Sequence, residues 1–241
     1  STLTNKDAYF IGLSFGTLLQ KKFLGKKVCV GFDGRLSSPE LSENLIQGLI
    51  LTGIDIVEIG CVPSPLLYFS VYSEKTDAGI IITGSHNPAD YNGFKFILPN
   101  RVFYGKDILE LGVICEKGKF IEGKGTRVKK NLEGNYITRL LENIKFPKKI
   151  KIVWDPGNGA TSNIISRLIL ELPGNHYLIN AEIDGTFPNH HPDPTVEENL
   201  IQLKDTIIKN DCDIGFAFDG DGDRLGIVDS EGRVIWGDQI L

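Results

Sequence analysis

Two short loops of this sequence carry side chains that can do chemistry. Residues 83–88 read TGSHNP, which puts Ser85 in a turn bounded by glycine and proline, directly after an apolar strand. Residues 219–224 read DGDGDR, which puts three carboxylates at alternate positions in a loop whose glycines disfavour a helix. A hydroxyl nucleophile and a site for a hard cation are the two components that phosphoryl transfer needs. We therefore predict that the fold brings the two loops together.

The acidic loop is interpreted as a site for Mg²⁺, Mn²⁺ or Ca²⁺, with Asp219, Asp221 and Asp223 as ligands. Three carboxylates in one small volume repel one another unless a cation neutralises them, and oxygen ligands select a hard cation rather than zinc. An EF-hand begins in the same way, but Arg224 stands where that loop needs glycine, and Ser230 stands where it needs glutamate. Arg224 is expected either to pair with the aspartates or to bind a phosphoryl oxygen beside the metal. The remaining alternative is a solvated acidic turn.

Ser85 needs an activating base because a serine hydroxyl is a weak nucleophile. His86 and Lys95 are the nearest candidates, and a lysine in a closed site beside a divalent cation loses its proton more easily. Lys95 is alternatively a surface lysine at the start of a strand, and residues 85–88 alternatively form only a hydrogen-bonded turn. Ser85 does not stand in a Gly-x-Ser-x-Gly elbow, which argues against a hydrolase of that type.

Three further segments have both a binding and a structural interpretation. Residues 155–160 (DPGNGA) link a strand to a helix and can cradle a phosphate, but they lack the common phosphate-loop patterns and favour a tight turn. His190 and His191 suggest a metal site, but neighbouring side chains of an extended chain point apart, which favours a structural loop. Arg35, in a loop after a strand, is expected either to meet a substrate phosphate or to lie at the surface.

The rest of the chain predicts the elements that must position these loops. Apolar strands alternate with amphipathic helices, for example a strand at 27–32 followed by a helix capped by Ser38, and both loops follow the carboxyl end of a strand. Open α/β sheets bind ligands at that edge. We predict an α/β fold of two consecutive three-layer α/β/α domains with mixed, mostly parallel sheets. The predicted domains are 1–146, which carries Ser85, and 147–241, which carries the aspartates, so the loops should meet at the cleft between domains.

Composition limits the class of protein. The chain has 41% hydrophobic residues and a net charge of -5 without a basic region, which disfavours a nucleic-acid partner. No apolar run approaches the roughly 20 residues that a membrane helix needs. Four dispersed cysteines and no visible signal peptide favour reduced thiols in the cytoplasm. The chain begins at Ser1, lacks methionine and ends in residues 237–241, which read as the start of a helix, so we expect a fragment of a longer protein.

These motifs resemble the α-D-phosphohexomutase superfamily, most closely its bacterial phosphomannomutase/phosphoglucomutase branch. Residues 83–95 are similar to the catalytic serine loop of that family, residues 219–224 to its metal loop, and residues 184–194 to a further family motif. The resemblance covers essentially the whole chain but only the first two of the four domains usual in the family. The third and fourth domains, which recognise the sugar and bind phosphate, lie outside it.

The resemblance implies a phosphohexomutase that interconverts hexose 1-phosphate and hexose 6-phosphate, with mannose and glucose favoured over glucosamine. It implies a phosphoserine at Ser85, a hexose 1,6-bisphosphate intermediate, and one Mg²⁺ bound by the serine phosphate and the three aspartates. Lys95 corresponds to the proposed general acid/base of the family, assisted by His86, and Arg224 to a contact with the phosphoserine. The implied partner is a phosphosugar, with no nucleic acid or membrane, and a monomer or weak dimer is expected.

Two other functions stay open at this point. The same serine and metal can release phosphate to water, as a metal-dependent phosphatase or phosphotransferase, if the site remains open to solvent. The chain can also be an inactive fragment or a structural relic. Because the resemblance does not reach the sugar-binding and phosphate-binding domains, we expect these 241 residues alone to be a poorly active mutase.

Overall fold

The computed structural model describes residues 3–142, 144 and 149–240. The predicted domain boundary between residues 146 and 147 lies outside these ranges. The chain forms two compact units, and the second includes two short loops from the N-terminal half, one of which contains Ser85. The first unit is made of Ser1–Phe32, Ser37–Thr83 and Asp90–Leu132, and the second of Asp33–Leu36, Gly84–Ala89 and Glu133–Leu241.

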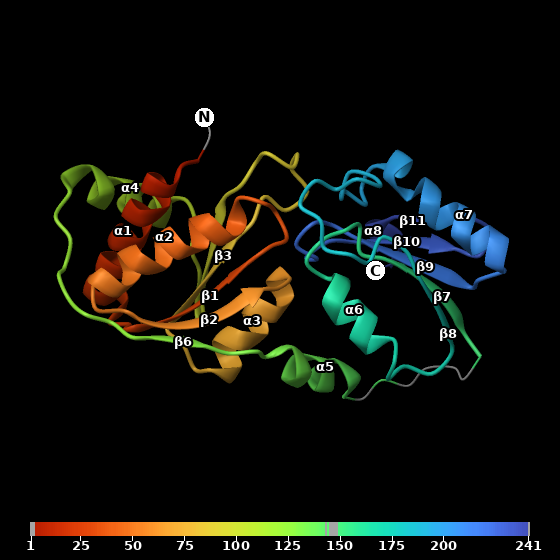
Figure 1. The fold of residues 1–241 in the computed structure, drawn as a ribbon, viewed down its shortest axis with the longest axis horizontal. Helices are drawn as coiled ribbons and strands as arrows, with labels where there is room; N and C mark the ends of the chain where they lie inside the picture. Colours follow the sequence, from red (N-terminus) through yellow and green to blue (C-terminus); the bar gives the residue numbers. More distant parts are fainter. Residues whose placement is uncertain (1–2, 143, 145–148, 241) are drawn as a thin grey trace. The chain divides into compact units, whose positions relative to one another are not determined.

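The described residues of the first unit form six strands and four helices: β1 (Lys27–Phe32), β2 (Asp55–Cys61), β3 (Ala78–Ile82), β4 (Phe94–Leu98), β5 (Arg101–Val102), β6 (Arg127–Lys129), α1 (Asn5–Phe23), α2 (Ser38–Leu51), α3 (Ser64–Ser73) and α4 (Lys106–Lys117). The sheet order is β5-β4-β3-β1-β2-β6. The pairs β1–β2, β1–β3 and β2–β6 are parallel, whereas β3–β4 and β4–β5 are antiparallel. Figure 1 shows α1 and α2 on one face of this sheet and α3 on the other.

Helices on both faces bury the central strands of this sheet. All five residues of β3 are buried, as expected for an uninterrupted apolar strand in a covered sheet. Val30 belongs to the same core cluster as Phe15 of α1. On the other face, a Cβ on Gly79 would lie 2.5 Å from Val71 of α3, so glycine lets this helix approach closely. The end of β3, three residues before Ser85, is therefore held within a well-packed layer.

The start of α2 differs from the prediction. The helix begins at Ser38, with Ser37 as the N-cap residue and without a side-chain capping hydrogen bond, so the prediction that Ser38 caps the helix is wrong. The amide of Asn92 donates to the hydroxyls of both serines, at 2.9 and 2.8 Å. The Ser37 hydroxyl therefore accepts from a distant residue rather than from an N–H of the first helical turn.

The second unit contains α5 (Glu133–Leu141), β7 (Lys151–Asp155), α6 (Ser162–Leu168), β8 (Asn175–Leu178), the short 3₁₀ helix η1 (Glu197–Leu200), α7 (Ile201–Asn210), β9 (Ile214–Phe218), β10 (Leu225–Asp229), β11 (Val234–Ile235) and α8 (Gly237–Ile240). The sheet order is β11-β10-β9-β7-β8. The strand β7 is parallel to β8 and β9, and β10 is antiparallel to β9 and β11. Figure 1 shows α7 and α6 on opposite sides of this sheet.

The core of the second unit also has two sides. Val153 of β7 and Ala217 of β9 pack with Leu203 of α7. Trp154 has the opposite orientation, since side chains alternate along a strand, and its ring lies 5.0 Å from the ring of Phe216. The predicted α/β fold with two three-layer domains and mixed sheets is confirmed. Among the described helices, none combines the length and the apolar character that crossing a bilayer requires.

Candidate active site

Ser85 is held in a backbone conformation that residues other than glycine rarely adopt. It follows β3 through Thr83 and Gly84, and its φ is +50°. The N–H of Asn87 donates to the carbonyl of Gly84 at 2.9 Å, which closes the turn predicted for residues 83–88. Only 9% of Ser85 is exposed. Strain of this kind persists where surrounding contacts enforce it, and it is concentrated at functional sites.

The acidic loop begins where β9 ends and closes on itself. The N–H of Asp219 donates to the carbonyl of Arg224 at 3.3 Å, and the N–H of Arg224 donates to Oδ1 of Asp219 at 3.1 Å. The N–H of Gly222 donates to the carbonyl of Asp219 at 3.0 Å. Oxygens of Asp219, Asp221 and Asp223 all lie within 4.8 Å of one another. The alternation with glycine thus gathers three carboxylates into one small volume, as predicted.

The serine turn and the acidic loop contact each other. The hydroxyl of Ser85 donates to Oδ2 of Asp219 at 2.8 Å. A Cβ on Gly220 would lie 2.5 Å from the carbonyl oxygen of Ser85, so this close approach requires glycine. The prediction that the fold brings the two loops together is confirmed. Both loops belong to the second compact unit, whereas the sequence assigned them to different domains.

Burial raises the pKa of one carboxyl group in the acidic loop. Asp219 and Asp221 are fully buried, and Asp223 is exposed. Burial and then the charge of Asp221 raise the pKa of Asp219 to about 6, although hydrogen bonds from Ser85 and the backbone of Arg224 act in the opposite direction. A carboxylate that is costly to ionise gains more from a neighbouring cation. Three carboxylates without nitrogen or sulfur ligands suit Mg²⁺ or another hard cation, so the residues present fit the predicted metal.

His86 and Arg224 both lie near Asp193. Burial raises the pKa of Asp193, but hydrogen bonds from Thr195, with smaller contributions from His86 and Arg224, outweigh it and hold the pKa below its usual value. The Thr195 hydroxyl donates to Oδ1 of Asp193 at 2.6 Å. Within the described part of the chain, the buried Nδ1 of His86 has no hydrogen-bond partner. Such a nitrogen can bind a ligand or exchange a proton.

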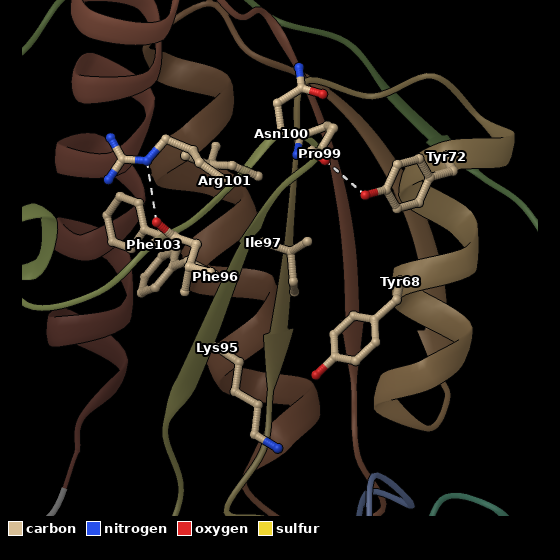
Figure 2. Close-up of a pocket in the computed structure, with 11 residues that line it drawn as sticks. Tyr68, Tyr72, Lys95, Phe96, Ile97, Pro99, Asn100, Arg101 and Phe103 are labelled. Atoms are coloured by element: carbon tan, nitrogen blue, oxygen red, sulfur yellow. Dashed lines mark hydrogen bonds between the residues drawn. The ribbon is translucent and has the colours of Figure 1, made fainter.

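Lys95 lies on β4 in the first compact unit, at one end of a pocket of about 590 Å³. Figure 2 shows its side chain and that of Tyr68, from α3, extending toward the same end of this pocket. At the other end, the hydroxyl of Tyr72 donates to the carbonyl of Pro99 at 2.8 Å. Because Lys95 and Ser85 belong to different units, the role of Lys95 as an acid or base stays a prediction.

Arg35 is the functional candidate that sequence reasoning described least well. It is 1% exposed, so of its two expected positions the one at the surface is wrong. Its guanidinium donates to the carbonyl oxygens of Ser85, Asn87 and Pro88. No spacing pattern signals these contacts, because the partners lie at least 50 residues further along the chain.

Residues 155–160 and His190 support the acidic loop from outside it. Oδ1 of Asp155 accepts the N–H of Gly157 at 2.9 Å, and Nε2 of His190 lies 3.0 Å from Oδ2 of Asp155. The N–H of Ala160 donates to the carbonyl of Gly220 at 3.0 Å. These contacts favour the structural interpretation of both segments, as a turn and a loop that brace the residues around a binding site.

Comparison with known proteins gives two matching family models. The model described as phosphoglucomutase/phosphomannomutase, alpha/beta/alpha domain I, matches residues 1–118, and the model for alpha/beta/alpha domain II matches residues 134–232. The chain is 40% identical over 242 residues to a phosphoglucomutase from Neisseria gonorrhoeae, covering 100% of this chain and 52% of that protein. It is 39% identical over 241 residues to a phosphomannomutase/phosphoglucomutase from Pseudomonas aeruginosa, with the same coverage of both chains.

A solved structure with the same fold is that of a phosphoglucomutase/phosphomannomutase family protein from Burkholderia thailandensis. It is 40% identical to this chain, with a TM-score of 0.93, and the match covers 99% of this chain and 54% of that one. The chain spans about half the length of the curated relatives it matches.

Proposed function

Because the chain belongs to the phosphoglucomutase/phosphomannomutase family, with regions that match domains I and II, we propose that it interconverts hexose 1-phosphate and hexose 6-phosphate. The observation that carries this proposal is the 2.8 Å hydrogen bond from Ser85 to Asp219, beside the clustered carboxylates. Phosphoryl transfer depends on positioning and on electrostatic stabilisation, and a hydroxyl at the edge of a cation site supplies both.

In the proposed cycle, Ser85 begins as a phosphoserine. The bond from its Oγ to phosphorus breaks as a hydroxyl oxygen of a hexose monophosphate bonds to that phosphorus, and the hydroxyl proton passes to a base. The Ser85 oxygen takes up a proton as its bond to phosphorus breaks, so the product is hexose 1,6-bisphosphate and unmodified Ser85. The bisphosphate then returns its other phosphoryl group to the Ser85 oxygen. The proton of the Ser85 hydroxyl passes to a base, and the sugar oxygen that loses the phosphoryl group takes up a proton. The net result moves phosphate between positions 1 and 6, and no water is consumed.

The other side chains have proposed roles around this serine. The three aspartates would hold one Mg²⁺ together with the serine phosphate, and the metal would supply positive charge that stabilises the transferring group. His86 and Lys95 are proposed to carry protons, and the buried, unpartnered Nδ1 supports this role for His86. Arg224 is proposed to bind the phosphoserine, a role supported by its exposed position at the end of the acidic loop.

Glucose and mannose phosphates are the proposed substrates, since the relatives above take their names from both sugars. The proposed location is the cytoplasm. The four cysteines, all within the described residues, form no disulfide, which supports a reducing compartment.

Intact-mass spectrometry tests the phosphoserine. After incubation with Mg²⁺ and glucose 1,6-bisphosphate, the protein is expected to gain the mass of one phosphoryl group, and peptide mapping is expected to find it on Ser85. Ser85→Ala should gain none, whereas a control variant at an exposed serine, Ser37→Ala, should gain the group as the wild type does. Phosphorylation that persists in Ser85→Ala would overturn the proposal.

A metal-dependent phosphatase or phosphotransferase is the second candidate function. The observation that favours it is the exposure of Asp223, which leaves one side of the carboxylate cluster open to solvent. Free phosphate and isomerised hexose phosphate measured in one reaction distinguish the two. A mutase converts substrate to its isomer with little release of phosphate, whereas a phosphatase releases one phosphate for each substrate consumed.

A further inference from the structure

Arg35 has the largest side chain among the fully buried residues, and its guanidinium lies against the serine turn. Nη2 donates to the carbonyl of Ser85 at 2.8 Å and to that of Asn87 at 2.7 Å, and Nη1 donates to the carbonyl of Pro88. A buried guanidinium is tolerated only when its donors are satisfied. Here one rigid, planar group binds three main-chain oxygens of a single turn.

Asp33 extends this contact to the residue before the serine. Its Oδ2 accepts Nε–H of Arg35 at 3.1 Å and the N–H of Gly84 at 3.2 Å. Its Oδ1 accepts the backbone N–H of Arg35 at 3.1 Å. Asp33 is 1% exposed, so this ion pair is shielded from water. Together, the two side chains hold the backbone on both sides of Ser85, whose φ is +50°.

Phe187 connects the guanidinium with the acidic loop. Its ring centroid lies 5.2 Å from Cζ of Arg35, within the range of a cation–π interaction. The tip of the same ring would lie 3.6 Å from a Cβ on Gly220. The N–H of Phe187 donates to the carbonyl of Asp184 at 3.0 Å, which fixes the turn that presents the ring. One aromatic side chain therefore packs between the residue that binds the serine turn and the loop that contains Asp219.

Glycine permits the close packing of this region. A Cβ on Gly185 would lie 2.6 Å from the carbonyl oxygen of Gly34 and 2.8 Å from Cα of Arg35. The segment before Phe187 therefore lies directly against the loop that carries the guanidinium. Contacts this tight leave Arg35 little freedom to move relative to Phe187.

We propose that Arg35, together with Asp33 and Phe187, is a positioning residue that sets the distance between the Ser85 hydroxyl and Asp219. By binding three carbonyls, the guanidinium keeps Ser85 in the left-handed conformation that directs Oγ toward the carboxylates. Without it, the turn relaxes toward the more favourable α or β regions, and the hydroxyl leaves its place. The inference rests on the proposed function of Ser85, and Arg35 itself is not required to touch the substrate.

The role of Arg35 is geometric because Asp33 already compensates its charge. Lysine would keep the charge but could not bind three oxygens with one planar group. We therefore expect Arg35→Lys to behave like Arg35→Gln rather than like the wild type. Preserved activity in Arg35→Lys, with loss only in Arg35→Gln, would mean that charge matters and would overturn the geometric role.

The test measures kinetics and hydrogen exchange on the same variants. Arg35→Lys is expected to lower kcat for glucose 1-phosphate by about 100-fold, the effect of displacing a reacting group by about 1 Å, while KM changes by less than about threefold. Amide exchange should accelerate in residues 84–89 and remain unchanged in β7 and β9. The matched control is Arg127→Gln, because Arg127 binds Glu43 and Glu58 in the first unit and makes none of the described hydrogen bonds to the serine turn. It should leave kcat within about twofold.

Phe187→Leu keeps the test decisive if the arginine variants do not fold. It preserves an apolar side chain but removes the ring over the guanidinium, and it is expected to lower kcat by about 10-fold with the same confined exchange pattern. Wild-type kcat in the folded variants, or unchanged protection of residues 84–89, would overturn the inference. If the wild type never phosphorylates Ser85, the proposed function fails instead, and the exchange measurement still decides whether Arg35 holds the turn.

Discussion

The serine turn and the acidic loop contact each other, but different kinds of contact dominate in fixing their backbones. The acidic loop is closed by hydrogen bonds among its own residues, from Asp219 to Arg224. The serine turn is held mainly by the side chains of Asp33 and Arg35, which precede it by about 50 residues. Each of the two loops involves an arginine. Arg224 contributes its backbone to the acidic loop, and Arg35 contributes its guanidinium to the serine turn.

Each loop also has a contact of the other kind, from the N–H of Ala160 to the carbonyl of Gly220 and from the N–H of Asn87 to the carbonyl of Gly84. Local hydrogen bonds therefore dominate in the acidic loop, whereas contacts from distant side chains dominate in the serine turn.

Removing a buried carboxylate from the acidic loop is expected to have the largest effect. Asp221→Asn should lower Mg²⁺ affinity by more than about 10-fold and activity by more than about 100-fold, because a hard cation loses an anionic ligand. The described hydrogen bonds that close the loop involve Asp219, Gly222 and Arg224, so the loop itself should keep its shape. Titration calorimetry with Mg²⁺ measures the affinity. Wild-type affinity in this variant would contradict the metal assignment.

Enlarging Gly220 should separate the two loops. In Gly220→Ala the new Cβ meets the carbonyl oxygen of Ser85 at 2.5 Å, so we expect the free energy of unfolding to fall by about 1–3 kcal/mol and activity to fall with it. Urea unfolding and turnover measure the two effects. Gly112→Ala is the matched control, since a Cβ there has no neighbour within 4 Å among the described residues, and it should be neutral or stabilising by up to about 1 kcal/mol. Equal stability of the two variants would mean that the loops are not in contact.

The pKa of Asp219 predicts how the metal-free protein responds to pH. Its carboxyl binds a proton more tightly in the folded chain, with a pKa of about 6 against an ordinary value of 3.8. The folded state is therefore favoured when the pH lies below these two pKa values. It loses stability as the pH rises through the range between them, by an amount on the order of 3 kcal/mol. Asp219→Asn should remove the part of this pH dependence that comes from the Asp219 carboxyl. Urea unfolding at pH values below and above this range measures the change in the free energy of unfolding.

Mg²⁺ should reverse this pH dependence, because the cation competes with the proton and binds more tightly as pH rises. Parallel stability profiles of wild type and Asp219→Asn, without metal, would show that Asp219 is not perturbed as described. That result would mean that burial does not alter the carboxyl group that accepts the Ser85 hydrogen bond.

The smallest effect on metal affinity and on stability is expected for Arg224→Gln, because this substitution leaves the main chain of the acidic loop unchanged. Mg²⁺ affinity should stay within about twofold and the free energy of unfolding within about 0.5 kcal/mol, because the side chain is exposed. Calorimetry and urea unfolding check both quantities. A large loss of metal affinity would mean that the acidic loop, like the serine turn, depends on an arginine side chain, and the difference between the two loops would disappear.

The sequence predicts what depends on local pattern. The apolar residues before the serine turn predicted the strand that the structure shows as β3, and the alternation of aspartate with glycine predicted a carboxylate cluster. It did not predict the buried role of Arg35, the contact of Phe187 with the guanidinium, or the hydrogen bonds from Asn92 to the serines at the start of α2. Each of these depends on residues that are far apart in the chain, so only the packed structure identifies the partner.

The left-handed backbone at Ser85 limits which hydroxyl can serve as nucleophile. Threonine carries the same functional group, but its branched Cβ is strongly disfavoured at a φ of +50°. A threonine at this position would have to leave that conformation, and the carbonyls bound by Arg35 would move with it. The choice between the two alcohols is therefore made by the shape of the main chain rather than by the reactivity of the hydroxyl group.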